Sequence, residues 1–348
     1  MLKSKLSKFH TWEDRKKMEQ FWAKKKVLVT GAGGFIGSHL VERLTKAGAS
    51  VRAFVRYNSR ADPGLLRMAS PETVSMLELI GGDLRDFDAI RKAVEGCDFV
   101  FHLGALISIP YSYLHPIEVA ESNIMGTLNV LTACRDLGVE RLIHTSTSEV
   151  YGTALKAMID ESHPLQGQSP YSASKIGADK LAESFHCTYD LPVVTVRPFN
   201  TYGPRQSARA VIPTIITQAL AGNTIRLGNT DAIRDFTYVD DTVNGFLCAA
   251  MAENVNGGTF NLGTGEAISI GNLSDRIIQK VGTHVKVELE AGRLRPQKSE
   301  VKRLLSDNTL ARERLNWKPN VSFDDGLDKT ISWVRENLKH YRIGVYEL

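Results

Sequence analysis

Short apolar segments and amphipathic segments alternate along the first 200 residues of the chain. Six segments have the length and apolar content of buried strands, at 26–30, 50–55, 77–83, 98–103, 139–145 and 193–196. Most of the segments between them repeat apolar residues with helical spacing, at 38–47, 86–95, 116–137 and 171–189. Strands that alternate with helices are typical of a doubly wound parallel sheet. We therefore expect an α/β fold with helices on both faces of one sheet.

The pattern changes after residue 200. Shorter elements follow, including a helix at 211–221, a strand within 226–241 and a final amphipathic helix at 323–338. We expect one domain over 27–200 and a smaller C-terminal α/β domain over 201–348, with part of 236–265 returning to the first domain.

Residues 1–26 form a basic extension with nine Lys/Arg and three Asp/Glu. Phe9, Trp12, Met18 and Trp22 fall roughly on one face of a helix, and Thr11 with Asp14 resembles a capping box. We expect this helix to pack on its own domain or on a neighbouring subunit. Contact with a membrane surface or a nucleic acid is the alternative.

Composition narrows the class of protein. The net charge is +4, and the chain beyond residue 26 is close to −2, which argues against a nucleic-acid binder. The most apolar run, 99–114, contains His102, Gly104 and Pro110 and is too short to span a bilayer. The four cysteines form no C-x-x-C pair, so we expect neither a disulfide scaffold nor a metal site. Without a secretory signal pattern, the chain reads as cytoplasmic.

A glycine-rich turn joins the first strand to the first helix. Gly31, Gly34 and Gly37 give G-x-x-G-x-x-G, which allows a tight turn, close approach of the backbone to a pyrophosphate, and close packing of helix on strand. The order strand, glycine turn, helix and second strand makes this a strong signal for a Rossmann dinucleotide site. The expected cofactor residues there are Gly31, Gly33, Gly34, Phe35, Ile36 and Gly37.

Further cofactor contacts are expected where other strands end. Leu103, Gly104 and Ala105 would pass beside the cofactor. Asp83, next to Leu84, could accept a hydrogen bond from the adenine amino group or could cap the helix at 86–95.

The residues after the second strand bear on the choice of cofactor. An acidic residue that would accept from the adenosine ribose is missing there, and Arg56 and Arg60 could meet a 2′-phosphate. We expect NAD(P)+ with a slight preference for NADP. An arginine that stacks on adenine is the alternative.

The end of the fifth strand and the helix after it bring together a set of reactive side chains. Thr147, Ser148 and Glu149 follow the strand, and Tyr171 and Lys175 lie one helical turn apart. A hydroxyl, a carboxylate, a tyrosine and a lysine suit proton and hydride chemistry on a sugar.

These motifs resemble the extended short-chain dehydrogenase/reductase family over about residues 27–338. The resemblance rests on G-x-x-G-x-x-G at 31–37, Gly-Asp-Leu at 82–84, Tyr-x-x-x-Lys at 171–175, Arg-Pro-Phe-Asn at 197–200 and Arg-Asp-Phe-Thr-Tyr-Val-Asp-Asp at 234–241. Within that family the chain is most similar to nucleotide-sugar 4,6-dehydratases, above all those that act on N-acetylglucosamine nucleotides in legionaminic-acid-type pathways. The likeness is carried by the segments at 145–153, 169–180 and 293–301.

The resemblance implies a role for each catalytic residue. Tyr171 would take the proton of the sugar O4, and Lys175 would stabilise the phenolate and hold the nicotinamide ribose. Thr147 would hydrogen-bond O4 and the tyrosine oxygen. Once C4 is oxidised, Glu149 would remove H5 and start loss of the C6 hydroxyl, after which hydride would return to C6. The cofactor would therefore be tightly bound and recycled.

One departure keeps other reactions open. Glucose-type 4,6-dehydratases usually have an aspartate where this chain has Ser148. Mannose-type dehydratases and UDP-glucuronate decarboxylases share Thr-Ser-Glu, and the decarboxylases also have an arginine at the position of Arg234. A 4-epimerase and a 5,6-dehydratase are further alternatives. A non-catalytic dinucleotide sensor would not need Tyr171, Lys175 and Glu149 together.

The resemblance also assigns the substrate region. Arginine forks match phosphates, and the 201–348 segment is rich in arginine. We expect a UDP- or GDP-linked hexose as the substrate, with the base and the hexose left open, and a homodimer formed through the helices at 116–137 and 171–189. The expected substrate residues are Asn200, Arg209, Val211, Arg226, Arg234 and Arg295.

Overall fold

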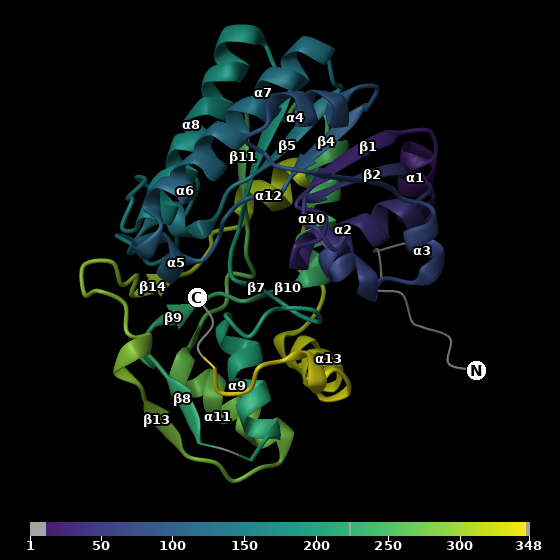
Figure 1. Cartoon of the computed structure of the whole chain (residues 1–348). Helices are drawn as coiled ribbons and strands as arrows, with labels where there is room; N and C mark the ends of the chain where they lie inside the picture. Colours follow the sequence, from purple (N-terminus) through teal and green to yellow (C-terminus); the bar gives the residue numbers. More distant parts are fainter. Residues whose placement is uncertain (1–11, 223, 346–348) are drawn as a thin grey trace.

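The structure of the protein is a computed structural model that describes residues 12–222 and 224–345 (Figure 1). Within these residues, seven strands form one sheet in the order β11-β6-β5-β4-β1-β2-β3. All its pairings are parallel, which confirms the predicted doubly wound arrangement. The strands are β1 (Lys26–Thr30), β2 (Ser50–Arg56), β3 (Glu78–Gly82), β4 (Phe99–His102), β5 (Arg141–Thr145), β6 (Val193–Pro198) and β11 (Thr259–Leu262).

The strand order reverses between β1 and β4. The chain leaves β1 toward β2 and β3 on one side, then returns to β4, β5 and β6 on the other side. In such sheets, ligands bind outside the carboxyl ends of the strands at this reversal. The glycine turn after β1 and the Gly104 segment after β4 both lie there.

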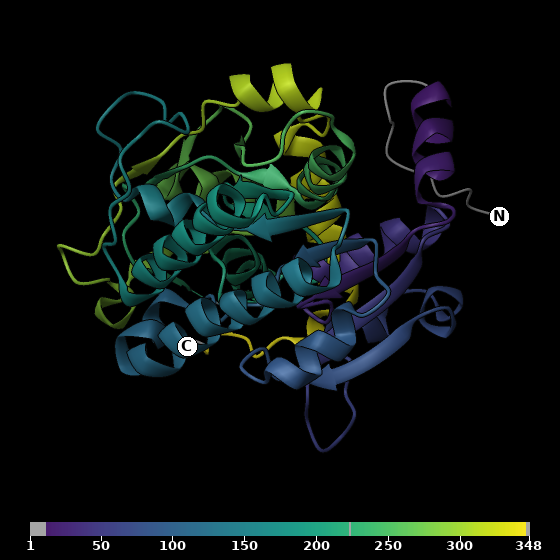
Figure 2. The same ribbon diagram turned by 90° about the horizontal axis from the view of Figure 1, so that it is seen from above.

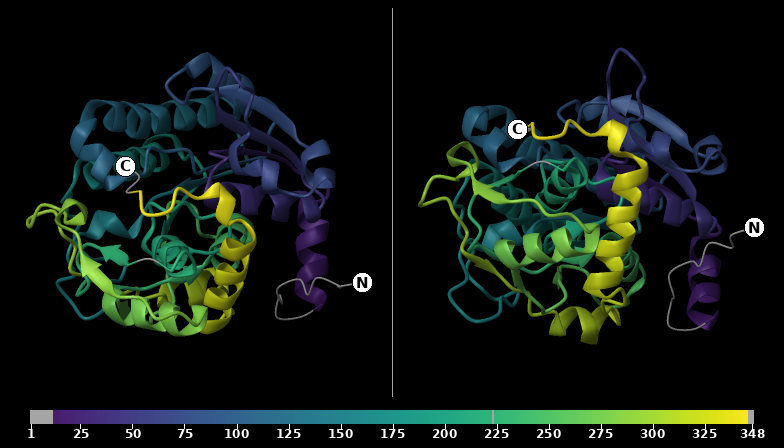
Figure 3. Two further views of the ribbon diagram at one scale, coloured as in Figure 1. Left: turned by 60° about the horizontal axis from the view of Figure 1, so that its bottom comes forward. Right: turned by 90° about the horizontal axis from the view of Figure 1, so that it is seen from below.

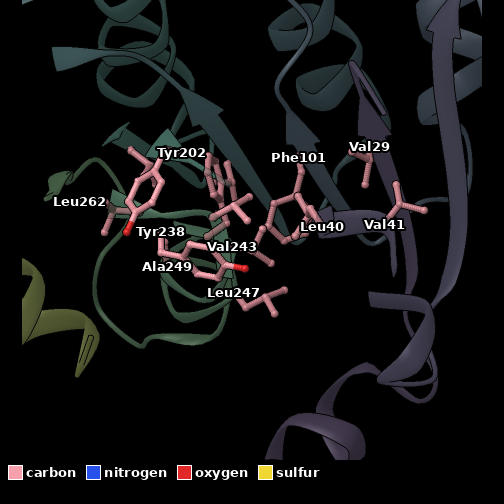
Figure 4. Packing of buried hydrophobic residues seen from close by; sticks show 14 of the residues in the cluster. Val29, Leu40, Val41, Phe101, Tyr202, Tyr238, Val243, Leu247, Ala249 and Leu262 are labelled. Carbon is pink, nitrogen blue, oxygen red and sulfur yellow. The ribbon is translucent and has the colours of Figure 1, made fainter. Parts of the chain in front are cut away.

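Helices cover both faces of the sheet because the strands are apolar on both sides. On one face, apolar residues of α4 (Phe87–Val94), α7 (Gly126–Leu137) and α8 (Pro170–Tyr189) share a core with Leu28, Val100 and Leu142 of the strands. On the other face lie α2 (Phe35–Lys46) and α10 (Val239–Met251). Figure 4 shows Leu40 of α2 on the side where Val243 and Leu247 of α10 lie, with Val41 nearer Val29 of β1.

The helix predicted at 116–137 is interrupted. It consists of α6 (Pro116–Ala120), one π-helical turn, η2 (Glu121–Met125), and α7. Asn123 in that turn is buried and its side chain donates to the carbonyl of Leu106 and to Ser174 Oγ, both at 2.9 Å. The Asn123 Oδ1 atom also accepts from the Leu106 amide at 2.8 Å. The turn therefore fastens the segment after β4 to α8.

The basic extension contains a helix, α1 (Trp12–Trp22), that stands at the rim of the molecule (Figure 2). Met18 and Trp22 are buried, and the Trp22 ring lies 5.2 Å from that of Phe99. The described part of the extension thus packs on its own domain. Phe9 and the capping residue Thr11 lie outside the described residues.

The rest of the chain builds a smaller layer beside the carboxyl ends of the strands (Figure 3). Its helices α9 (Val211–Leu220), α11 (Ile270–Val281) and α13 (Phe323–Glu336) pack on one another. Strand β11 and helix α10, although late in sequence, belong to the main sheet and its face. Among the described residues, no helix has both the length and the apolar character needed to cross a membrane. The short strands of the smaller layer include β7 (Thr201–Tyr202), β8 (Ile225–Leu227), β9 (Ile233–Arg234), β10 (Thr237–Tyr238), β12 (Ile268–Ser269), β13 (Val287–Leu289) and β14 (Arg303–Leu304).

Candidate active site

The glycine turn after β1 has no room for side chains. Gly31 has a φ of +67°, and a Cβ built there would lie 2.7 Å from the Gly104 nitrogen. A Cβ on Gly37 would lie 2.2 Å from the Gly31 carbonyl oxygen. Helix α2 starts at Phe35, directly after the turn. The backbone N–H groups of its first turn therefore have no carbonyl partner within the helix. A turn of this kind at a helix N-terminus can accept a phosphate group, so the predicted cofactor role of these residues stays a prediction.

A cavity of about 920 Å³ extends from this turn to the reactive side chains. It lies at the carboxyl ends of β1, β4, β5 and β6, where the topology predicts a ligand. The residues predicted for cofactor binding or catalysis that line it are Gly31, Gly33, Gly34, Phe35, Ile36, Gly37, Arg56, Leu103, Gly104, Ala105, Thr147, Ser148, Glu149 and Tyr171. Asn200 also lines this cavity. Lys175 is buried and is not one of its lining residues.

A smaller cavity of about 140 Å³ adjoins the turn and is lined by Asp83, Leu84, Arg56 and Gly104, among others. The Asp83 carboxylate accepts hydrogen bonds from Nε and Nη2 of Arg85 at 3.0 and 2.8 Å. These hydrogen bonds are the main cause that lowers the pKa of Asp83. The cap of α4 is Asp86, whose side chain accepts from the Ala89 amide, so Asp83 does not cap that helix.

Arg56 borders both cavities and is mostly exposed. Its side chain is 67% exposed and lies 3.4 Å from Glu118. The loop after it is ordered by Asn58, which accepts from the amides of Arg60 and Asp62. The guanidinium of Arg56 is therefore held only weakly and is accessible from the cavity.

Tyr171 and Lys175 are both buried on α8. Burial raises the pKa of Tyr171 well above its usual value, and a hydrogen bond with Thr147 opposes this effect. Burial lowers the pKa of Lys175 to about 8. The Lys175 ammonium donates to the Thr145 carbonyl at 2.7 Å, which ties α8 to the end of β5.

Helix α8 begins where it does because Ser169 caps it. Ser169 Oγ accepts from the Ser172 amide at 3.1 Å, and Ser172 Oγ accepts from the Ser169 amide at 2.9 Å. This reciprocal pair, followed by Pro170 in the first turn, starts the helix one residue before Tyr171. The helix start thus places the tyrosine at the cavity.

A second cavity of about 320 Å³ continues from the first toward the smaller layer. The two share Asn200, Thr201, Gln206 and Ala210 as lining residues, so they adjoin. All six residues predicted to hold the substrate line the second cavity: Asn200, Arg209, Val211, Arg226, Arg234 and Arg295. The side chain of Asn200 is already used, since it donates to the Asp235 carbonyl at 3.0 Å.

The junction of the two cavities is charged. Arg295 Nη1 lies 3.8 Å from Glu149 Oε1. The buried guanidinium of Arg234 lies 3.5 Å from Glu300. Burial lowers the pKa of Arg234, and the charge of Glu149 counteracts this effect. Two arginines and two carboxylates therefore meet where the two cavities adjoin.

Several lining residues were not predicted from the sequence. The loop with Asn58, Asp62 and Gly64 covers the glycine turn, where the Leu65 amide donates to the Gly33 carbonyl at 2.9 Å. Gln206 borders both cavities. The Asn-x-x-x-Asp-Pro-Gly spacing at 58–64 was a turn signal that could have pointed to this loop. Within the described part of the chain, no group of three or more His, Cys, Asp or Glu side chains is arranged to hold a metal ion.

Comparisons with known proteins agree with this geometry. The family described as GDP-mannose 4,6-dehydratase matches residues 28–330. A UDP-glucose 4-epimerase of Mycolicibacterium smegmatis is 35% identical over 89% of this chain and 98% of its own length. A UDP-N-acetyl-alpha-D-glucosaminuronate decarboxylase of Bacillus cytotoxicus is 33% identical over 90% of this chain and 98% of its own.

A solved structure shows the same relationship. The dTDP-glucose 4,6-dehydratase DesIV of Streptomyces venezuelae, a double mutant with NAD bound, superposes with a TM-score of 0.80 at 31% identity, covering 90% of this chain and 98% of that one. The relatives thus share the fold over nearly their whole length while they catalyse different reactions on nucleotide sugars. The chain belongs to the GDP-mannose 4,6-dehydratase family, within the extended short-chain dehydrogenases/reductases, as the motifs indicated.

Proposed function

We propose that the protein is an NAD(P)-dependent nucleotide-sugar 4,6-dehydratase. It would oxidise C4 of the sugar, eliminate water across C5 and C6, and reduce C6, with UDP- or GDP-N-acetylglucosamine as the expected substrate. The observation that carries this proposal is the position of Glu149, a carboxylate that lines the same cavity as Thr147 and Tyr171. A 4-epimerase needs no base at carbon, whereas a dehydratase does.

In this proposal Tyr171 removes the O4 proton as C4 is oxidised. Burial opposes ionisation of the phenol, so the phenolate needs a positive charge nearby. Lys175, one turn along α8, supplies it. Thr147 orients O4, since it lines the cavity and hydrogen-bonds Tyr171.

Glu149 then acts at C5. Oxidation at C4 acidifies H5, and the Glu149 carboxylate removes it while the C6 hydroxyl leaves. Ser148 is buried beside it and carries no ionisable proton at neutral pH, so Glu149 would also protonate the leaving hydroxyl. The reaction consumes no net oxidant because the electrons taken from C4 return to C6.

The cofactor in this proposal is NAD(P)+. Bound at the glycine turn, it supplies the oxidant for C4 and returns the same electron pair to C6. The accessible guanidinium of Arg56 at the end of β2 supports the slight preference for NADP, because it could pair with a 2′-phosphate. The NAD found in the DesIV structure supports the other choice.

The substrate would lie across both cavities. Its sugar would face Tyr171 and Glu149, and its diphosphate would reach the arginines of the second cavity, Arg209, Arg234 and Arg295. Arg226 and Val211, which line the same cavity, would contact the base.

A second candidate is a uronate decarboxylase. Arg234 and Arg295 lie close to Glu149, and two arginines at this point would suit a substrate carboxylate at C6. In that reaction C4 is oxidised in the same way, and carbon dioxide is lost instead of water. The decarboxylase relative supports this alternative.

We also propose a homodimer formed through α6, α7 and α8. Ile117 and Met125 on the interrupted helix are 73% and 47% exposed, which suits a surface that a second copy covers. Sedimentation equilibrium of the purified protein would test this. The cytoplasmic location stays a prediction.

The product masses test the proposed function. The purified protein would be incubated with UDP- and GDP-N-acetylglucosamine, UDP-glucuronate and UDP-galactose. Loss of water from an N-acetylglucosamine nucleotide supports the dehydratase, whereas loss of carbon dioxide from the glucuronate supports the decarboxylase. An unchanged mass with a new isomer would mean a 4-epimerase.

A further inference from the structure

The sequence motifs assign no role to Asp179, the acid that lies one helical turn after Lys175 on α8. Its side chain is buried, with 4% exposed. Residues four apart on a helix lie on the same face, so Asp179 and Lys175 lie on the same side of α8, facing the sheet. A buried carboxylate costs free energy unless it is hydrogen-bonded and its charge is balanced.

Three side chains from the sheet hold this carboxylate in place. His144 Nε2 on β5 lies 3.0 Å from Oδ1. Ser146 Oγ, after β5, donates to Oδ2 at 2.7 Å. Arg197 on β6 donates to the same oxygen through Nε and Nη2, at 3.2 and 2.9 Å. Hence Asp179 is fixed by hydrogen bonds from two strands.

Arg197 has a second fixed partner. Its Nη1 donates to the Tyr151 hydroxyl at 2.9 Å, and that hydroxyl donates to Asn261 Oδ1 at 2.7 Å. These side chains are buried, so the position of the Arg197 charge is fixed as well. The network therefore has few ways to relax when one of its charges changes.

The charges around Lys175 are unequal. Lys175 donates to the Thr145 carbonyl, which carries no net charge. At this place two buried cations, Lys175 and Arg197, have one buried carboxylate, Asp179, which is ion-paired with Arg197 at 2.9 Å. Two positive charges thus share one negative charge, and one positive charge is left over next to Tyr171. The Tyr171 phenolate would balance it.

We propose that Asp179 is a positioning residue whose fixed, buried carboxylate keeps Lys175 charged beside Tyr171. The carboxylate acts through its field on Lys175 and touches neither the sugar nor the cofactor. The inference rests on the proposed function, in which Tyr171 is the base and Lys175 stabilises its phenolate.

Other titratable groups near Lys175 and Asp179 could also supply charge to Lys175. His144 on β5 and His102 on β4 face Lys175 and Asp179. Burial lowers the pKa of both histidines, so they are neutral near pH 7 and supply no charge. His144 Nδ1 is buried and has no hydrogen-bond partner within the described part of the chain, which agrees with a neutral ring that donates through Nε2.

The remaining titratable neighbours of Lys175 and Asp179 are Arg197, Tyr171 and Glu149. Burial acts to raise the pKa of Asp179, but the hydrogen bond with His144 and the charges of Arg197 and Lys175 hold it below its usual value. Asp179 is therefore an anion at every pH where the enzyme would work. Burial lowers the pKa of Lys175, and Asp179 counteracts this effect. Glu149 and Asp179 both act on Tyr171 in the direction that disfavours its ionisation.

The test compares Asp179→Asn with Ser146→Ala in the full-length protein. The first variant removes the charge, and the second removes one hydrogen bond to the same oxygen and keeps the charge. The Cε resonance of Lys175, assigned with Lys175→Arg, would be followed by ¹³C NMR from pH 6 to 11, together with kcat and KM for the nucleotide sugar. Asp179→Asn should lower the Lys175 pKa, and with it the alkaline limb of kcat, by about one unit or more. Ser146→Ala should move either by much less, and Asp179→Glu should restore the wild-type values.

If Asp179→Asn fails to fold, Asp179→Asn/Arg197→Gln removes the opposite charges together and avoids an uncompensated cation. Because loss of the Arg197 charge acts on Lys175 in the opposite direction, the reference for this double variant is Arg197→Gln alone, and the Lys175 pKa of the double variant should lie below that of Arg197→Gln. An unchanged Lys175 pKa in Asp179→Asn, or equal Lys175 pKa values in Arg197→Gln and the double variant, overturns the proposal, even if stability falls. The NMR titration does not depend on turnover, so a wild type that converts no nucleotide sugar refutes the proposed function alone.

Discussion

Glu149 lies 3.8 Å from Arg295, and this pair stands where the first cavity meets the second. The two residues are far apart in sequence, and they come from different layers of the fold. Arg295 lines the second cavity with 26% of its side chain accessible, and among the described residues its Nη1 atom has no hydrogen-bond partner. In the proposed function this guanidinium would donate to the diphosphate.

Replacing Arg295 should weaken substrate binding more than it slows the chemistry. A hydrogen bond to a charged group contributes about 1.5–3 kcal/mol, so Arg295→Gln should raise the KM for the nucleotide sugar by about tenfold or more. The exposed Arg312 on the helix α12 (Thr309–Leu315), which lines neither cavity, provides the matched control Arg312→Gln. Initial rates over a range of substrate concentrations give both constants. An unchanged KM in Arg295→Gln would remove this residue from the diphosphate site.

Removing the Tyr171 hydroxyl should stop the first proton transfer. General base catalysis contributes about 10²–10⁴-fold, so kcat in Tyr171→Phe should fall by that factor. Cofactor content should stay at the wild-type level because the glycine turn is untouched. Tyr189→Phe changes the exposed tyrosine at the other end of α8 and should have no effect. A sensor that only binds the cofactor would be indifferent to both changes.

A methyl group in the glycine turn should prevent cofactor binding. A Cβ on Gly37 would lie 2.2 Å from the Gly31 carbonyl oxygen, so Gly37→Ala must shift the turn. We expect the purified variant to retain at least tenfold less NAD(P) than the wild type, as measured by release on denaturation. A Cβ on Gly292 would meet no described atom within 4 Å, so Gly292→Ala should retain as much NAD(P) as the wild type. Equal retention in both variants would contradict a cofactor site at this turn.

The buried histidines should make stability depend on pH. Burial lowers the pKa of His144 below 6.5, so the unfolded chain takes up a proton there before the folded chain does. Stability from this residue is therefore complete above pH 6.5 and is lost as the pH falls toward the folded-state pKa. Each such group adds a slope of about 1.4 kcal/mol per pH unit. Urea unfolding at several pH values should show this loss.

His144→Gln separates this contribution from those of other groups. It should reduce the slope below pH 6.5 by about one proton, while His102, which burial also holds in the neutral form, keeps its own part. A variant with the same slope as the wild type would mean that His144 is already protonated in the folded protein.

The fold was predictable because its signals are local. Each predicted strand of the main sheet lies within two or three residues of an observed one, since apolar runs and turn residues are read directly along the chain. The π-helical turn at Glu121–Met125 was not predicted. It depends on Asn123, whose side chain bonds with Leu106 and Ser174 from other segments, and helical periodicity alone carries no trace of such contacts.

The candidate site was predictable only in part, for the same reason. The glycine turn and Tyr171 with Lys175 have fixed spacings, so the sequence displays them. The network around Asp179 draws His144 and Arg197 from two different strands, and only the sheet register brings them together. The pair of Glu149 with Arg295 likewise needs the smaller layer to fold against the main sheet.

The most direct test of the account is the fate of H5 in deuterated water. Wild-type protein and Glu149→Gln would be given the nucleotide sugar that the wild type converts, and the products and bound cofactor would be analysed by mass spectrometry, NMR and absorbance. We predict that the wild-type product has lost water and carries solvent deuterium at C5. Glu149→Gln should oxidise C4 and stop there, with reduced cofactor accumulating and no deuterium at C5. A Glu149→Gln variant that still eliminates water and exchanges H5 would contradict the role of Glu149 as the carbon base, on which the proposed function rests.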